Sequence, residues 1–483
     1  MHRLAVGLLS LVAAVPTSRA EYNYYGPTEL LVSLGTQAFM TCNGLFVSNR
    51  TLDQIYEQEL KLDRMPILPP EQVHIDKTLR AVAVGDGSFR APVMRAVYRE
   101  GLGCIVLSPD QTFADAASLP ELRLPPAPGD AATLPWPEGD LVPSRPLPPG
   151  IHPKALEAAW DWAFDRRTHG HPSEVTLSLL VVHRREIVFE RYAPGVDVTT
   201  RTRTWSAAKS IAGALVGIAV SQGNLDLDAP LPYAEGDPRR SVTLRHVLHM
   251  SSGLDSVDND RCAVVGSCLS YWGGASSVAG ALARGLVSRP GIRWDYENYD
   301  TILAVHALKK ALGARDYLAF PRAALLDRIG MRSTLVGVDR FGDFVLSSQI
   351  YTNARDLARF GLLYLNRGKW PGPQAATVVP ESWVDFSRTP APASASGGGF
   401  YGAHWWLVPD DRKDVPADAY AAAGNRGQYV IVVPSHDLVI VRRGLDWLPG
   451  QHSLPRWDLT REVLKAFPKR PGGAKPRPSP PPA

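Results

Sequence analysis

Short apolar segments with strand-like spacing lie near both ends of residues 151–467. Leu177–His183 and Glu186–Tyr192 predict a hairpin, because a basic dipeptide separates them at a two-residue turn. Gln428–Val433 and Leu438–Arg442 predict a second pair of strands, divided by a four-residue turn segment. The sequence therefore predicts strands at the beginning and at the end of this region.

Helical patterns fill the space between these strands. Pro153–Arg166 has an apolar stripe at helical spacing, and Ile211–Val220 is apolar throughout. The second segment is shorter than the roughly 20 residues that a membrane span requires, so we interpret it as a core helix. Strands at both ends with helices between them predict an α+β fold, in which helices cover one antiparallel sheet.

Residues 21–118 form a predicted N-terminal accessory region. Gln54–Leu62 is a short helical stretch, and Thr78–Val84 and Pro92–Tyr98 are strand-like segments around the turn sequence at 85–88. We find no catalytic signature here. The sequence leaves packing, substrate access and partner binding open as roles for this region.

Three segments are expected to lie outside folded domains. Residues 1–20 have a basic start, a short apolar stretch and small residues before Ala20, which indicates a secretory signal peptide. Residues 119–150 are rich in proline and predict an extended linker. Residues 468–483 contain mainly Pro, Lys, Arg and Gly and predict a disordered tail. The expected location is therefore the periplasm or the exterior of the cell, with no membrane span after signal removal.

The overall composition narrows the classes of partner. The 483 residues are 45% hydrophobic and carry a formal net charge of +4, which is ordinary for globular domains. Residues 1–20 contribute two of these charges, through Arg3 and Arg19. Nothing in this balance indicates binding to nucleic acid or to an anionic membrane. The oligomeric state is left open.

The four cysteines predict two disulfides, because an even count is typical of an exported chain. We prefer to pair neighbours within each region, giving Cys42–Cys104 and Cys262–Cys268. Buried free thiols are the alternative. The spacing does not resemble a zinc site, and we expect no metal and no cofactor.

The clearest chemical signal is the tetrad from Ser206 to Lys209, which is the only S-x-x-K sequence in the chain. Side chains three positions apart lie on one face of a helix, so the hydroxyl and the amine are expected side by side. Burial lowers the pKa of a lysine, and a neutral amine can accept the hydroxyl proton. The alternative is a helix cap followed by a lysine that reaches solvent.

Two further segments could complete such a site. Tyr296 and Asn298 form a Y-x-N sequence, in which a nearby cation such as Lys209 could lower the pKa of the phenol. Gly424-Asn425-Arg426-Gly427-Gln428 enters a strand and could offer a backbone N–H to an oxyanion, together with that of Ser206. Taken alone, each segment also fits an ordinary loop or strand entry.

Together with His249-Met250-Ser251-Ser252-Gly253-Leu254, these motifs resemble the serine hydrolases related to class C β-lactamases and penicillin-binding D-alanyl-D-alanine peptidases. The order of the motifs is similar to that of the 6-aminohexanoate-dimer hydrolase and esterase branch. The resemblance covers about residues 155–445. It implies a β-lactamase/transpeptidase-like fold, with an all-helical subdomain beside the sheet and, in this chain, an N-terminal extension.

The resemblance also implies roles for single residues. Ser206 would be the acylated nucleophile, Lys209 and Tyr296 would share the general base and acid duties, and Asn298 would hold Lys209 and the substrate. If Asn425, Arg426 and Gly427 occupy the place of the K-T-G or H-T-G motif of the family, the N–H of Gln428 would join that of Ser206 in binding the oxyanion.

The third motif departs from the family pattern, because the usual Lys or His is missing. Arg426 could supply the cation, although a guanidinium is bulkier and fixed in geometry. The departure favours hydrolysis of a small ester or amide over β-lactam or peptide cleavage. The alternative function is a penicillin-binding or cell-wall-peptide-binding protein with little or no turnover.

Overall fold

The computed structural model describes residues 28–62, 66–88, 92–123, 131–258, 261–370, 376–396, 400–447 and 453–468. The expected signal peptide at 1–20 lies outside these residues, and so does the expected tail apart from Pro468. None of the described helices combines the length and the apolar character that crossing a bilayer requires.

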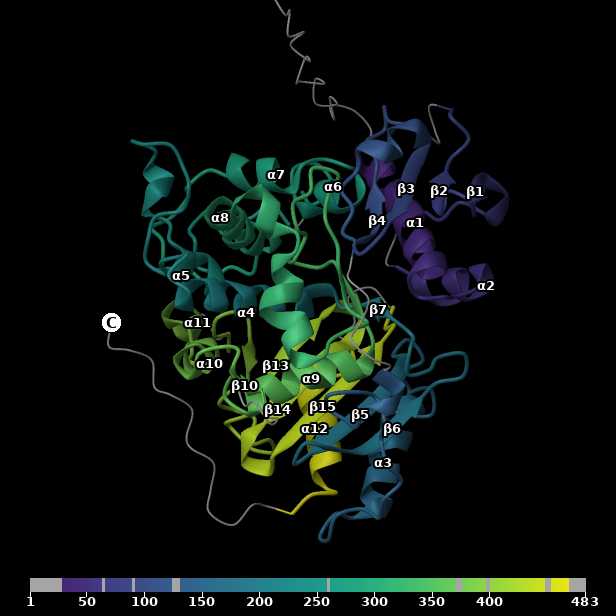
Figure 1. The fold of residues 1–483 in the computed structure, drawn as a ribbon, viewed down its shortest axis with the longest axis vertical. Helices are drawn as coiled ribbons and strands as arrows, with labels where there is room; N and C mark the ends of the chain where they lie inside the picture. The colour runs from purple at the N-terminus through teal and green to yellow at the C-terminus, as the bar shows by residue number, and fades with distance from the viewer. Residues whose placement is uncertain are drawn as a thin grey trace, which may run out of the picture.

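An antiparallel sheet of six strands forms the centre of the main region, and the spatial order of its strands differs from their order in the sequence (Figure 1). Its strands, in spatial order, are β12 (Trp406–Leu407), β13 (Tyr420–Gly424), β14 (Gln428–Val433), β15 (Leu438–Gly444), β5 (Thr176–His183) and β6 (Glu186–Tyr192). Both predicted strand pairs are present. They meet because the last strand, β15, pairs antiparallel with β5, so the two ends of the region form one sheet.

Alternate residues of the four central strands, β13, β14, β15 and β5, enter two different cores. In β5, Leu180 and Val182 join the core beneath α9 (Ala354–Leu365), whereas Leu179 and Val181 join a second core on the opposite face. Helices α3 (Pro153–Phe164) and α12 (Arg456–Leu464) cover this second face. These central strands are therefore buried on both sides, which explains why they are almost continuously apolar, whereas the edge strand β6 carries charged side chains.

A helical subdomain adjoins this sheet, as Figure 1 shows above it. Its core is α4 (Ala208–Ser221), which is buried along nearly its whole length. The neighbouring helices are α5 (Leu244–Leu248), α6 (Ser267–Trp272), α7 (Ser277–Ala283) and α8 (Asn298–Tyr317). The predicted α+β fold with an all-helical subdomain is confirmed.

Short elements complete this region. They are the three-stranded sheet β7 (Thr202–Arg203), β9 (Ile350–Thr352) and β8 (Leu335–Val336), the pair β10 (Lys369–Trp370) and β11 (Ala376–Thr377), and the helices α10 (Glu381–Arg388) and α11 (Pro392–Ser396).

The accessory region packs a long helix against its own sheet. Its four strands, in spatial order, are β1 (Val73–Asp76), β2 (Ala81–Val84), β3 (Met94–Arg99) and β4 (Gly103–Val106). Helix α1 (Thr28–Phe46) packs on β2, β3 and β4, and α2 (Leu52–Gln54) follows it. The disulfide Cys42–Cys104 joins α1 to β4, and Cys262–Cys268 closes a short loop before α6. Both predicted pairings are confirmed.

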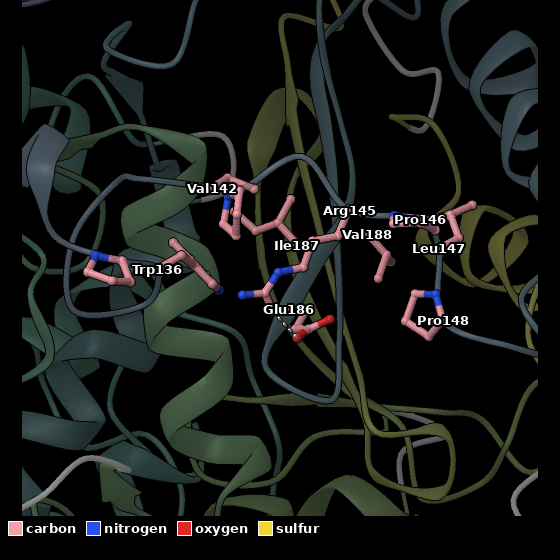
Figure 2. Close-up of a pocket in the computed structure, with 11 residues that line it drawn as sticks. Trp136, Val142, Arg145, Pro146, Leu147, Pro148, Glu186, Ile187 and Val188 are labelled. Carbon is pink, nitrogen blue, oxygen red and sulfur yellow. Dashed lines mark hydrogen bonds and ion pairs between the residues drawn. The ribbon is translucent and has the colours of Figure 1, made fainter.

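The described part of the proline-rich segment is held against the main region. Trp136 donates from its indole nitrogen to the carbonyl of Arg185 (2.8 Å), and Arg359 donates to the carbonyls of Pro137 and Gly139. A small cavity of about 170 Å³ lies between this segment and β6 (Figure 2). The segment thus covers the edge strand β6, which would otherwise expose unpaired backbone groups.

Candidate active site

Ser206 lies on a tight turn that leads into the buried helix α4. Residues Trp205–Ala207 form a single 3₁₀ turn, and Trp205 adopts a left-handed backbone conformation with φ of 50°. Such a conformation is strained for a bulky residue and persists only where packing enforces it. Here the guanidinium of Arg203 stacks 4.0 Å from the Trp205 ring. The strained turn fixes the backbone immediately before the Ser206 hydroxyl.

The amine of Lys209 lies beside this hydroxyl and is almost completely buried. Its Nζ donates to Ser206 Oγ (3.0 Å), to Asn298 Oδ1 (2.6 Å) and to the carbonyl of Ser347 (2.9 Å), and the residue is 1% exposed. Burial lowers the pKa of Lys209 to about 7, against a smaller opposing effect of Asp258 and Glu297. A large fraction of the amine is therefore neutral near pH 7, as the sequence predicted.

Tyr296 closes the other side of this pair. Its ring centroid is 4.9 Å from Lys209 Nζ, and its hydroxyl hydrogen-bonds with Ser206. We expected a nearby cation to lower the pKa of the phenol, but burial raises it to about 12, since desolvation outweighs the Ser206 hydrogen bond and the charge of Arg456. Tyr296 is thus a neutral phenol that can relay or donate a proton.

Asn298 holds Lys209 through contacts on three sides. Its Oδ1 accepts from Lys209, its Nδ2 donates to Ser267 Oγ (3.1 Å), and its backbone N–H donates to Asp258 Oδ2 (3.0 Å). Asn298 is also the first residue of α8, whose N-cap Glu297 accepts from the N–H of Tyr299. The amide orientation is fixed by this network, and the side chain presents oxygen to the amine.

Asp258 and Glu297 form a buried acidic pair behind Asn298, which sequence reasoning missed. Glu297 is 2% exposed and accepts from the N–H groups of Val257 (2.9 Å) and Tyr299 (3.2 Å). Burial and the hydrogen-bonded carboxyl of Asp258 raise the pKa of Glu297, while that of Asp258 is lowered despite burial because Glu297, Ser267 and Asn298 bond to it. The pair therefore shares one proton at neutral pH.

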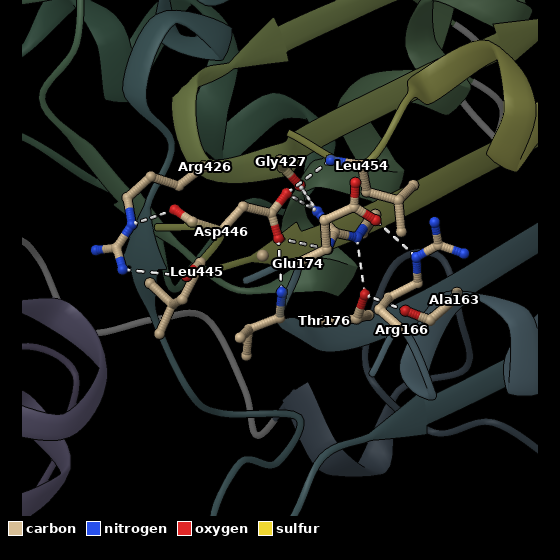
Figure 3. Close-up of polar contacts among 12 residues, drawn as sticks. Ala163, Arg166, Glu174, Thr176, Arg426, Gly427, Leu445, Asp446 and Leu454 are labelled. Atoms are coloured by element: carbon tan, nitrogen blue, oxygen red, sulfur yellow. Dashed lines mark hydrogen bonds and ion pairs between the residues drawn. The ribbon is translucent and has the colours of Figure 1, made fainter. Parts of the chain in front are cut away.

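The segment after β13 differs from our expectation in one important respect. We expected Arg426 to face the substrate, but it is 2% exposed and donates to the carbonyls of Glu59, Gln58, Leu445 and Asp446. Figure 3 shows two of these contacts beside Asp446. The assignment of Arg426 as a substrate cation is wrong, because its guanidinium is hydrogen-bonded to buried backbone carbonyls and does not line the cavity.

Gly427 and the side chain of Gln428 also point into this packed network. A Cβ on Gly427, whose φ is 74°, would lie 1.7 Å from Arg442 Nη1. Gln428 Oε1 accepts from Arg443 Nε (2.8 Å), and its amide donates to the carbonyl of Arg426 (3.1 Å). Gly427 and Gln428 therefore support the strand turn. Neither is among the residues that line the cavity at Ser206.

Gly424 is the residue of this segment that comes closest to the nucleophile. A Cβ at Gly424 would lie 2.1 Å from the carbonyl oxygen of Thr204 and 3.0 Å from the backbone nitrogen of Ser206. Only glycine permits this approach of β13 to the Ser206 turn. The glycine is visible in the sequence as the first residue of the segment 424–428. The comparison with the K-T-G motif nevertheless directed attention to residues 425–428.

Ser206 opens into a cavity of about 830 Å³, within the size range of small-molecule sites. Its walls carry aromatic and basic side chains along with the strand end at 423–425. The lining residues are Ser206, Tyr296, Trp406, Pro409, Arg412, Ala423, Gly424, Asn425, Tyr429, Ser453, Pro455, Arg456 and Trp457. Asn425 lines it as expected, although its Oδ1 accepts from the N–H of Arg426 (2.8 Å).

The Ser251–Leu254 segment is not part of this lining. Ser252 donates to Asp300 Oδ1 (2.9 Å), which ties the segment to α8 beneath the site. Within the described part of the chain, no group of three or more His, Cys, Asp or Glu side chains could hold a metal ion.

Comparison with known proteins places this geometry in a family. The sequence model of the family described as Beta-lactamase matches residues 164–443. The 6-aminohexanoate-dimer hydrolase of Paenarthrobacter ureafaciens is 25% identical over 289 residues, which cover 55% of this chain and 72% of that protein.

Solved structures show the same fold at low identity. A putative 6-aminohexanoate-dimer hydrolase from Bacillus anthracis has a TM-score of 0.51 at 19% identity, covering 60% of this chain and 77% of its own. A putative β-lactamase from Bacteroides dorei has a TM-score of 0.52 at 18% identity, and the match covers 65% of this chain and 99% of that protein. A class C β-lactamase mutant has a TM-score of 0.50 at 15% identity, and the match covers 66% of this chain and 99% of that protein.

Proposed function

Because the chain belongs to the β-lactamase family, we propose that it is a serine hydrolase that cleaves a small ester or amide through an acyl-enzyme. The observation that carries this proposal is the distance of 3.0 Å between the buried Lys209 Nζ and Ser206 Oγ, which is within hydrogen-bond reach for a proton transfer in either direction. A desolvated amine with a pKa of about 7 can take the hydroxyl proton at neutral pH.

The acylation step follows from the positions of these side chains. Ser206 Oγ attacks the substrate carbonyl while its proton passes to Lys209 Nζ. The negative charge that develops on the carbonyl oxygen is bound by the backbone N–H groups of Ser206 and Gly424, whose backbones approach each other closely. This proposal transfers the second oxyanion role from Gln428 to Gly424.

Tyr296 completes the proton path. Its neutral phenol hydrogen-bonds with Ser206 and can protonate the leaving oxygen or nitrogen, while a proton returns to it from Lys209. Water then attacks the acyl-enzyme, with the same groups moving protons in the opposite direction. Asn298 accepts a hydrogen bond from the Lys209 amine and holds it beside Ser206 during both steps.

Two further features support the details. Arg426 is bonded to the carbonyl of Glu59 and does not line the cavity, so the strand turn itself supplies no cation of the kind that the third motif of the family usually offers. The two disulfides support an exported protein, because such bonds persist in oxidising compartments.

The test is covalent labelling. A fluorophosphonate probe should modify Ser206, as located by mass spectrometry of peptides, and Ser206→Ala should abolish both labelling and hydrolysis of a 4-nitrophenyl ester. Ser210→Ala is the matched control, since Ser210 Oγ donates to the carbonyl of His404 (2.6 Å) away from the cavity. Ester turnover that is unchanged in Ser206→Ala would refute the proposal.

A parallel arm with a penicillin separates hydrolysis from binding. Rapid hydrolysis of the penicilloyl-enzyme, with release of penicilloate, or rapid release of the acyl group of the ester supports a hydrolase. A stable adduct on Ser206 without release would favour the alternative, a penicillin-binding or cell-wall-peptide-binding protein.

A further inference from the structure

The two backbone segments that the proposed mechanism uses to bind the oxyanion each contain a residue in a left-handed conformation. Trp205, immediately before Ser206, has a φ of 50°. Arg426, two residues after Gly424, has a φ of 59°. This conformation is costly for large side chains, so the surrounding packing must enforce both turns. The positions of the two N–H groups therefore depend on the contacts that hold Trp205 and Arg426.

The accessory region holds the second of these turns through Arg426. The guanidinium donates to the carbonyls of Glu59 (2.8 Å) and Gln58 (2.6 Å), at the end of the single π-helical turn Ile55–Glu59. The last carbonyls of a helical turn lack partners within the turn, so a cation that donates to them stabilises both segments. Burial lowers the pKa of Arg426 to about 10, and the guanidinium is still charged at neutral pH.

The segment that accepts from Arg426 is itself fixed to the main region. The buried carboxylate of Glu59 lies 3.2 Å from Arg50 Nε, and Arg50 Nη1 donates to the carbonyl of Gly195 (3.1 Å). An acceptor that is held from its other side can determine where Arg426 lies. The strand turn after Gly424 is therefore fastened to the accessory region at a defined position.

Helix α1 of the accessory region supports the turn before Ser206. The guanidinium of Arg203 lies 4.0 Å from the ring of Trp205 and 5.5 Å from the ring of Phe39. It also lies against Met40, with 3.9 Å between Arg203 Nη1 and the sulfur. Phe39 and Met40 are buried residues of α1. Arg203 thus connects α1 to the turn that carries the nucleophile.

The accessory region makes these contacts without lining the substrate cavity, whose lining residues all lie between 206 and 457. We propose that Arg426 is a positioning residue for Gly424, and that the accessory region holds the two oxyanion-binding segments at the separation that the reaction needs. The inference rests on the proposed function, and it assigns a role to the region whose role the sequence left open. Its contacts reach one segment through Arg426 and the other through α1.

The test compares Arg426 with a matched arginine. Arg426→Lys keeps the charge but replaces the planar fork by a single ammonium group, which cannot reproduce the contacts to both carbonyls. Arg359→Lys is the control, because Arg359 is also buried and donates to the carbonyls of Pro137 (2.8 Å) and Gly139 (2.6 Å). Both substitutions weaken contacts to a neighbouring segment, but only Arg426 holds the strand turn beside Gly424.

Two readouts report on the oxyanion site. In Arg426→Lys, kcat/KM for a neutral 4-nitrophenyl ester should fall about ten- to a hundredfold, since a misplacement of about 1 Å can cost a hundredfold. The concentration of active sites is titrated with a fluorophosphonate. The Ki of phenylboronic acid should rise by a similar factor. In that adduct Ser206 Oγ bonds to boron, its proton passes to Lys209, and a hydroxyl on boron takes the place of the oxyanion.

The pH of the acidic limb reports on Lys209 and should not move in Arg426→Lys, while Arg359→Lys should keep the wild-type value of all three quantities. Wild-type kcat/KM and boronate affinity in Arg426→Lys, or an equal loss in the control, would overturn the inference. A displaced acidic limb would mean that the substitution acts through the base, and would also overturn it. Turnover that is unchanged in Ser206→Ala is a different result, which refutes the proposed function itself.

Hydrogen exchange tests the positioning without any turnover. In Arg426→Lys, the peptide that covers 420–428 should exchange faster than in the wild type, whereas the control should leave it unchanged. Phe39→Leu trims the α1 side chain on the other contact, so it should speed exchange of the peptide that covers 204–208 and lower kcat/KM. Wild-type exchange of these peptides in both variants would reject the role of the accessory region.

Discussion

The backbone of Gly424 approaches that of Ser206 so closely that a Cβ on the glycine would lie 3.0 Å from the Ser206 nitrogen. The contact joins the end of β13 to the turn before α4. Two segments that are distant in the sequence thereby meet at the cavity wall, where the proposed mechanism places the oxyanion.

Gly424→Ala should therefore lower kcat by at least about a hundredfold, the range for losing one oxyanion donor. The added methyl group would also meet the carbonyl oxygen of Thr204 at 2.1 Å, which forces the two segments apart. Steady-state kinetics with a neutral 4-nitrophenyl ester would measure the loss. Gly285→Ala is the control, since nothing lies within 4 Å of a Cβ there. Comparable kcat values in the two variants would contradict the role of Gly424.

The depressed pKa of Lys209 predicts a pH dependence. Only the neutral amine accepts the Ser206 proton, and its fraction grows as the pH rises through the pKa of about 7. We expect kcat/KM to increase about tenfold per pH unit well below 7 and to level off above it. Rates between pH 5 and 9, with product measured at an isosbestic wavelength, would test this. A flat profile with chemistry rate-limiting would rule out the amine as base.

Asn298→Asp should move this acidic limb upward. The substitution places a carboxylate at the oxygen that now accepts from Lys209 at 2.6 Å. An opposite charge at that distance stabilises the ammonium form and raises the lysine pKa by about one to three units. The same pH series measures the shift. Asn425→Asp lines the cavity without a direct contact to Lys209 and should shift the limb less. Equal shifts in both variants would argue against a direct effect of Asn298.

Glu297 predicts a pH dependence of stability. Because its pKa is raised in the folded protein, the group stabilises the fold fully below its unfolded pKa of about 4.5 and loses this contribution as the pH rises through the folded value. Glu297→Gln keeps the shape but cannot ionise. The free energy of unfolding in urea, measured at pH 5 and pH 9, should fall more for the wild type than for this variant.

The exposed Glu235 serves as the comparison, since Glu235→Gln should retain the wild-type pH response. A wild type and a Glu297→Gln variant with parallel pH responses would mean that the acidic pair does not share a proton.

The two disulfides should differ in what their removal costs. Cys42–Cys104 closes a separation of 62 residues, and its replacement by alanines should lower the free energy of unfolding by about 4 kcal/mol in the chain-entropy model. Cys262–Cys268 closes only 6 residues, but its loop carries Ser267, which accepts from Asn298. Its removal should lower kcat/KM more than that of the longer bridge. A larger loss of unfolding free energy in urea for Cys262–Cys268, together with a larger loss of kcat/KM for Cys42–Cys104, would contradict this prediction.

The sequence by itself determined the elements that depend on local pattern. The strand pairs at both ends, the buried helix after Ser206 and the fold class follow from apolar spacing, which acts over a few residues. The adjacency of Ser206 and Lys209 also follows, because three positions of helix impose it. Both disulfide pairings agreed with simple neighbour pairing.

Only the tertiary structure decided which groups face the cavity. A Gly-rich strand entry does not reveal which of its residues points outward. Gly424, near Ser206, and Arg426, bonded to carbonyls of the accessory region, are two positions apart, and the left-handed backbone of Arg426 (φ 59°) belongs to the turn that follows the strand. Tyr296 is neutral for a related reason: desolvation depends on every element packed around it.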